Sequence, residues 1–145
     1  MITRMRRLLS IGLSGVALLC GAFVTLLRIR IALWVMPWNR IMTGAAGTFK
    51  VQSIRPAVDR LEWAVLAASR FVPRATCLTQ ALALHRLLSR CGYRSSVQIG
   101  VRLADGRFAA HAWVEHETKS LLSSAGEVLR YVRFFSWPPS QPDLP

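Results

Sequence analysis

Acidic residues are scarce in this 145-residue sequence, and the first of them, Asp59, comes only after about two-fifths of the chain. Seven acidic residues stand against nineteen basic ones, which gives a formal net charge of +12. The basic residues are scattered rather than gathered into a tract with interleaved aromatic residues, so the pattern does not favour a nucleic-acid-binding protein. We expect the charge to attract an anionic membrane surface or an acidic peptide instead.

Cysteine is also scarce, with three residues at positions 20, 77 and 91. An odd number without paired spacing argues against a disulfide framework and favours a reducing compartment, which predicts a cytoplasmic protein. The cysteines and the three histidines show neither C-x-x-C nor H-x₃-H spacing. The sequence therefore predicts no metal site and no cofactor.

Charge is missing altogether from Leu8 to Leu27. A helix of that length spans roughly 30 Å, close to the thickness of a bilayer core. A cleaved signal peptide is disfavoured because the apolar run is too long and lacks an A-x-A exit. Lipid attachment at Cys20 is disfavoured by the bulky Leu18 and Leu19 before it. Two interpretations stay open: a helix that spans the cell membrane or lies on its inner face, or a buried helix whose small residues allow close packing.

The rest of the chain predicts an α+β domain. Residues 34–50 read as a linker, and helices are expected at 56–71 and 77–90, with Gly92 closing the second. Alternation from Ser95, a turn at 104–107 and a strand over 108–115 predict an antiparallel hairpin, with a third strand near 121–122. The expected organisation is an apolar helix and linker in 1–50, a domain in 51–136 and a disordered tail in 137–145.

Cys77 is the candidate nucleophile. With Thr76 as the N-cap, its thiol would sit in the first turn of a helix, where the positive end of the helix dipole favours a thiolate. Backbone N–H groups of the same turn could hold an oxyanion. Cys20, inside the apolar run, and Cys91, before the closing glycine, fit a structural role better.

His111 is the candidate base, because a polar ring in mid-strand among small residues needs a partner. His85 lies among leucines on the Cys77 helix and is expected to be a packed core residue. His116 follows at the end of the strand and is expected to be solvated. A helix-start cysteine facing a strand-borne histidine is the papain-like arrangement.

Read together, the segments resemble the transglutaminase-like cysteine leader peptidases of lasso-peptide biosynthesis, in a stand-alone form without a leader-recognition domain. The resemblance covers residues 56–135 and rests on Arg74-Ala75-Thr76-Cys77-Leu78-Thr79-Gln80-Ala81-Leu82-Ala83-Leu84, Gly92, Ile99-Gly100-Val101 and Ala110-His111-Ala112-Trp113-Val114-Glu115.

This resemblance implies a papain/transglutaminase-like core, in which a helix bearing Cys77 packs on a small antiparallel sheet bearing His111. It implies a cysteine protease that removes the leader from a ribosomally synthesised precursor. Its expected partners are the precursor peptide, a separate leader-recognition protein and the lasso cyclase. Arg74, Gln80 and Trp113 are candidate substrate or oxyanion contacts. Solvated or structural roles fit Arg74 and Gln80 at least as well, and alternation favours Trp113 as core filler beside His111.

The sequence departs from this family at the third catalytic position, where an Asp is expected on the strand after the histidine. If 117–119 make the turn, the positions opposite His111 are Ser123, Ser124 and Ala125, and none is acidic. Glu115 lies four residues along the strand from His111, about 13 Å away at 3.3 Å per residue, which is too far to reach the ring. Glu127 could reach it only if the turn were wider. Ser123 and Ser124 are therefore the candidates.

Two other functions stay open on the same residues. A catalytically weak or inactive, membrane-associated scaffold for the cyclase and the leader-binding protein fits the missing Asp and the apolar front. An acyltransferase would pass the Cys77 thioester to an amine instead of water.

Overall fold

The computed structural model describes residues 13–45 and 55–138. Its elements are the helices α2 (Leu13–Val35), α3 (Trp38–Ala45), α4 (Val58–Ser69) and α5 (Cys77–Arg90), the strands β1 (Ser96–Ala104), β2 (Arg107–His116) and β3 (Lys119–Leu121), the short helix α6 (Ala125–Val128) and the strand β4 (Val132–Trp137). The predicted α+β fold class is confirmed.

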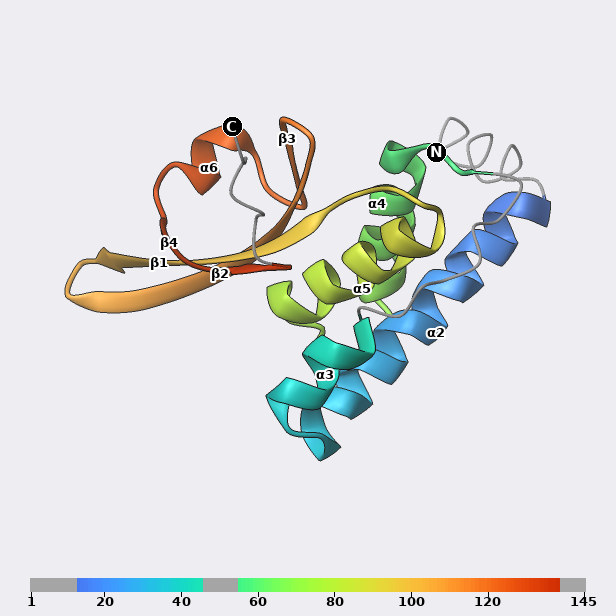
Figure 1. The fold of residues 1–145 in the computed structure, drawn as a ribbon, viewed down its shortest axis with the longest axis horizontal. Helices are drawn as coiled ribbons and strands as arrows, with labels where there is room; N and C mark the ends of the chain where they lie inside the picture. Colours follow the sequence, from blue (N-terminus) through green and yellow to red (C-terminus); the bar gives the residue numbers. More distant parts are fainter. Residues whose placement is uncertain (1–12, 46–54, 139–145) are drawn as a thin grey trace, which may run out of the picture.

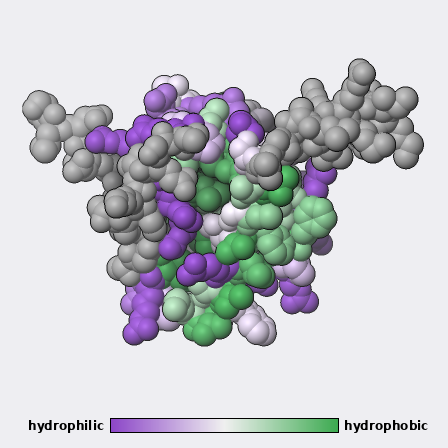
Figure 2. Space-filling view, turned by 90° about the vertical axis from the view of Figure 1, so that its right-hand side faces the viewer, coloured by the Kyte–Doolittle hydropathy of each residue, from purple (hydrophilic) through white to green (hydrophobic). Residues whose placement is uncertain are grey.

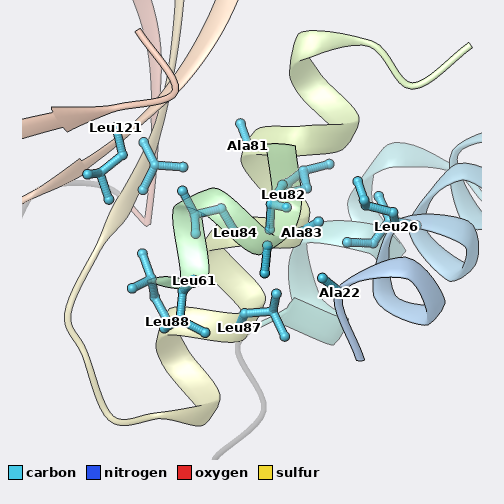
Figure 3. Close-up of a cluster of buried hydrophobic side chains, with 14 of the residues drawn as sticks. Ala22, Leu26, Leu61, Ala81, Leu82, Ala83, Leu84, Leu87, Leu88 and Leu121 are labelled. Carbon is cyan, nitrogen blue, oxygen red and sulfur yellow. The ribbon is translucent and has the colours of Figure 1, made fainter. Parts of the chain in front are cut away.

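The molecule is layered, with α2 on one side, α4 and α5 in the middle and the sheet beyond them (Figure 1). Helix α2 packs against α4 and α5, and α5 packs against β1 and β2. Figure 3 shows the apolar core between these elements, where Ala22 and Leu26 of α2 approach Ala83 and Leu87 of α5. The core therefore crosses the boundary that the sequence placed near residue 50.

Helix α5 has the two signals that its sequence predicted. Thr76 caps its start, since its hydroxyl accepts the backbone N–H of Thr79 at 3.4 Å. At the other end, Gly92 adopts a φ of +77°, and the N–H groups of Gly92 and Tyr93 bond the carbonyls of Ser89 and Leu88. This is a Schellman motif, which requires a left-handed residue that glycine supplies at little cost.

The sheet is antiparallel, with strand order β3-β2-β1-β4. The β1–β2 hairpin closes through Asp105 and Gly106, both with positive φ as a type I′ turn requires, so the predicted hairpin is confirmed. Val97, Ala112, Val114 and Leu121 point into the helical core. Because side chains alternate along a strand, His111 and Trp113 lie on the opposite face.

Three expectations about the elements were wrong. Helix α3 occupies the middle of the predicted linker, and Trp38 at its start packs edge-on against Phe135 of β4, with ring centroids 6.2 Å apart. Strand β4 and helix α6 were not predicted, and β4 extends through Trp137, the first residue of the predicted tail. The rest of that tail, 139–145, lies outside the described residues, as do residues 8–12 of the apolar run.

Candidate active site

Cys77 is the first residue of α5. Its side chain is half-buried and packs against the hydrophobic core. The hydroxyl groups of Thr76 and Thr79 form a hydrogen bond of 3.1 Å, which stabilises the turn that carries the thiol. The cap uses the N–H of Thr79, whereas the N–H groups of Cys77 and Leu78 have no acceptor within the helix because no preceding turn exists. These groups can therefore stabilise negative charge next to the thiol.

His111 lies in the middle of β2, directly opposite Gly100 of β1. Its ring stacks beside Trp113, with centroids 6.2 Å apart and planes at 22°, and it lies 5.4 Å from the ring of Tyr131. A Cβ on Gly100 would meet Tyr131 Cβ at 2.8 Å and the Trp113 ring at 2.9 Å. Glycine is therefore needed at this position so that both rings can approach the strand beside His111.

Ser123 supplies the hydrogen-bond partner of His111, through its hydroxyl and the Nε2 atom of the ring. The preceding residue holds it in place: the Leu122 N–H donates to Glu62 Oε1 at 2.7 Å, and Leu122 adopts a φ of +68°. A leucine in the left-handed region is strained, by about 1–3 kcal/mol. The backbone thus bends sharply next to Ser123, and a carboxylate of α4 fixes the bend.

The other polar candidates near His111 have different partners. Ser124 caps α6, because its hydroxyl accepts the N–H of Glu127 at 3.2 Å. Glu115 forms an ion pair with Arg133 at 2.6 Å and accepts the Trp113 Nε1–H at 3.3 Å. Among the described residues, no carboxylate hydrogen-bonds to His111.

Cys77 and His111 come from neighbouring elements, since α5 packs against β2. Ala112, the residue after His111, is buried in the core against which Cys77 packs. Within residues 13–45 and 55–138 no hydrogen bond joins the thiol to the imidazole. By strand alternation His111 lies on the sheet face turned away from α5, so the structure does not bring the imidazole and the thiol into contact.

The candidate substrate contacts differ in exposure. Arg74 is exposed, with a φ of +57° three residues before the nucleophile, and Gln80 is half-buried one turn after it. Trp113 is fully buried at 0% exposure, so it offers no surface to a substrate, and its role is to support the His111 ring. Of the two interpretations of Trp113, this burial favours core filler over a substrate contact.

Tyr131 is the site residue that sequence reasoning missed. It follows α6, twenty positions from His111, and no local pattern marks it. Its ring also lies under the guanidinium of Arg102, 5.1 Å away, at a polar recess of about 400 Å³ lined by Arg102, Ser124, Gly126, Glu127, Arg130 and Tyr131. The Nε atom of Arg102 is buried there without a hydrogen-bond partner.

The remaining histidines lie away from this site. His85 is buried as predicted, with Nδ1 2.8 Å from the Ser95 hydroxyl and its ring edge-on to Trp137, and burial lowers its pKa to about 4. His116 is half-buried rather than solvated, because its ring packs on Tyr93 and its Nδ1 lies 2.5 Å from the Arg94 carbonyl.

All three cysteines are free, and burial raises the pKa of the Cys91 thiol. Among the described residues, no group of three His, Cys, Asp or Glu side chains could hold a metal ion.

Comparison with known proteins gives one family. The model of the transglutaminase-like superfamily matches residues 23–136, most of the chain and all of the candidate site. No curated protein and no solved structure matches the chain. The superfamily includes cysteine proteases. The family match begins within α2, which agrees with the packing of that helix into the same core. The chain belongs to the transglutaminase-like superfamily.

Proposed function

We propose that this chain is a cysteine peptidase that removes the leader from a ribosomally made lasso-peptide precursor, with Cys77 as nucleophile and His111 as base. The observation that carries the peptidase chemistry is the His111–Ser123 hydrogen bond at the third catalytic position, in a transglutaminase-like domain whose α5 begins with a cysteine. The lasso-peptide substrate rests on the resemblance of the segments around Cys77 and His111.

The residues support the following reaction. The reaction requires the His111 ring and the Cys77 thiol to come into a contact that this structure does not have. His111 then takes the proton of the thiol, and Sγ attacks the carbonyl carbon of the leader–core bond. The N–H groups of the first turn of α5 stabilise the oxyanion, as it develops at the positive end of the helix. The imidazolium then returns its proton to the departing amine, which leaves with the core peptide. The leader stays on Sγ as a thioester.

Water completes the reaction. His111 removes a proton from the attacking water, the C–S bond breaks, and the proton passes to the thiolate, which restores the Cys77 thiol and releases the leader as a carboxylic acid. Ser123 holds the ring orientation in both halves of the cycle, because its hydroxyl can accept the Nε2–H of the imidazolium. An amine in place of water would give an amide, so the products distinguish a peptidase from an acyltransferase.

The proposed setting rests on the same resemblance. The partners would be the precursor, a separate leader-recognition protein and the lasso cyclase that closes the ring of the released core. Three free cysteines support a cytoplasmic location.

A second candidate is a catalytically weak or inactive scaffold for the cyclase and the leader-binding protein. The observation in its favour is the serine in place of a carboxylate beside His111. A neutral hydroxyl stabilises an imidazolium less than a carboxylate does, although a Cys–His pair depends on this third group less than a Ser–His pair does.

The experiment that tests the proposal is cleavage of the precursor encoded beside this gene, followed by mass spectrometry with the leader-recognition partner present. Wild type, Cys77→Ser and His111→Ala are compared, with Cys91→Ser as the matched cysteine control. We expect wild type and Cys91→Ser to release leader and free core peptide, whereas the other two variants lose at least a hundredfold in rate. An intact precursor with wild type, when the partner is shown to be bound, would favour the scaffold.

A further inference from the structure

Helix α2 has two apolar sides, and the other elements of residues 13–45 and 55–138 cover one of them. Ala22, Thr25, Leu26 and Ile29 are buried against α4 and α5. The opposite side carries a continuous stripe of exposed residues, here called the α2 stripe: Val16, Cys20, Phe23, Val24, Leu27, Ile31, Trp34 and Val35. At 100° per residue these positions fall within an arc of about 120°, along roughly 30 Å of helix.

Two arginines border the α2 stripe. By the same helical geometry, Arg28 lies just beyond one edge of the arc and Arg30 just beyond the other. Arg28 is exposed and Arg30 is partly exposed. No acidic residue precedes Asp59, so the charge around the stripe is positive throughout α2 and α3. Figure 2, which views the molecule from the α2 side, shows green apolar side chains with purple groups on both sides.

Aromatic residues lie at the C-terminal end of the stripe. Trp34 is 85% exposed, and Trp38 at the start of α3 is 40% exposed. Tryptophan is enriched at the membrane–water interface, where its ring meets both hydrocarbon and headgroups. An apolar face, flanking arginines and terminal tryptophans together are typical of a helix that lies in the plane of the interface.

The same packing argues against a helix that crosses the bilayer. Ser14–Val35 is long and apolar enough to do so, with a mean hydropathy of 2.1 over its most apolar window. However, its buried side is part of the domain core, and α4 and α5 carry charged residues that cannot follow it into hydrocarbon.

We propose that the α2 stripe binds the surface of an anionic lipid bilayer, with α2 parallel to the membrane and Arg28 and Arg30 reaching the phosphate headgroups. In the layered fold the sheet lies on the far side of α5, so the face that carries His111 and Ser123 would remain open to a peptide from solution (Figure 1). This membrane contact is independent of the proposed peptidase activity.

The test is flotation of the full chain with vesicles of phosphatidylcholine alone or with 30% phosphatidylglycerol. Three double variants, each lowering the net charge by two, are compared: Val24→Asp with Ile31→Asp in the stripe, Arg28→Gln with Arg30→Gln beside it, and Leu103→Asp with Leu129→Asp on exposed apolar residues of the sheet layer. We expect wild type to prefer anionic vesicles. The stripe pair should lose at least tenfold in binding, the arginine pair should lose the anionic preference, and the sheet pair should change by less than threefold.

Quenching by brominated lipids gives a readout that does not depend on the folding of these variants. Wild-type tryptophan fluorescence should be quenched by brominated anionic vesicles, and Trp34→Phe should lose a large part of that quenching. Absent vesicle binding, equal losses for the stripe and sheet pairs, or unquenched fluorescence of bound wild type would overturn the proposal. So would a wild-type dimer in lipid-free solution that the stripe pair converts to a monomer, because the stripe would then cover a second copy.

Discussion

Ser123 occupies the place at which a carboxylate would stabilise the His111 imidazolium. Its hydroxyl reaches Nε2 because the strained backbone of Leu122 and the Glu62 hydrogen bond direct the chain toward β2. Ser123 therefore hydrogen-bonds to the ring as the expected Asp would, but without a negative charge.

Restoring that charge should raise activity. We expect Ser123→Asp to increase kcat for precursor cleavage by tenfold or more, since loss of the carboxylate charge costs about 10⁴ in a serine protease and less in a Cys–His pair. Ser123→Ala should lower kcat several-fold. Kinetics with the leader-recognition partner present measure both, and Ser124→Ala, the neighbouring hydroxyl that caps α6, is the matched control. A folded but inactive Ser123→Asp would contradict the assigned position.

At the residue scale, counting along the strand reduced the candidate partners of His111 to Ser123 and Ser124, because antiparallel register follows from the turn. The register Val114–Leu121 places residues 123 and 124 close to His111. Counting could not separate Ser123 from Ser124, since the separation depends on the φ of Leu122 and on a carboxylate sixty positions away. Tyr131 was missed for the same reason: its contact with His111 exists only after the strands assemble.

At the scale of the element, α5 is the part of the site that its own sequence determines. Its bounds, its N-cap and its closing glycine are all local signals, and the structure has them where the sequence predicted. Helix α3 shows the opposite case. Pro37 and Gly44 suggested a linker, but the helix is stabilised by the contact between Trp38 and Phe135, which lie almost a hundred positions apart.

The N-cap of α5 supports both stability and the position of Cys77. We expect Thr76→Ala to lower the free energy of unfolding by about 1 kcal/mol, because the Thr79 N–H loses its acceptor and the Thr79 hydroxyl its partner. Urea denaturation measures this change. Thr118→Ala, in the exposed β2–β3 turn, is the matched control and should change the free energy by less than 0.5 kcal/mol. Equal losses would show that the cap contributes nothing specific.

At the scale of the whole molecule, the sequence predicted the α+β class and the order of helices and hairpin, but not the layers. An apolar run is compatible with a bilayer or with a protein core. In the structure, one side of α2 is part of the protein core. His85 connects the helical layer to the sheet, because its ring on α5 packs edge-on against Trp137 of β4. It is neutral in the folded state, because burial lowers its pKa to about 4.

This burial predicts a loss of stability in acid. The unfolded chain binds a proton at His85 below its ordinary pKa of about 6.5, whereas the folded chain does not until about 4, so stability is full above pH 6.5 and falls as the pH drops toward 4. The contribution is on the order of 3 kcal/mol. Urea unfolding at pH 7 and pH 4.5 measures the fall, and His85→Gln should make it smaller. An unchanged fall in His85→Gln would remove His85 as its cause.

The order of synthesis gives the two-sided helix α2 a further consequence. Residues 13–35 leave the ribosome before α4 and α5, which bury one of its sides. At about 5–20 residues per second, the 55 residues from the end of α2 to the end of α5 take roughly 3–11 s to add. During that interval the nascent chain carries a helix with an apolar surface on both sides, so a chaperone or the membrane itself can capture it before the domain closes.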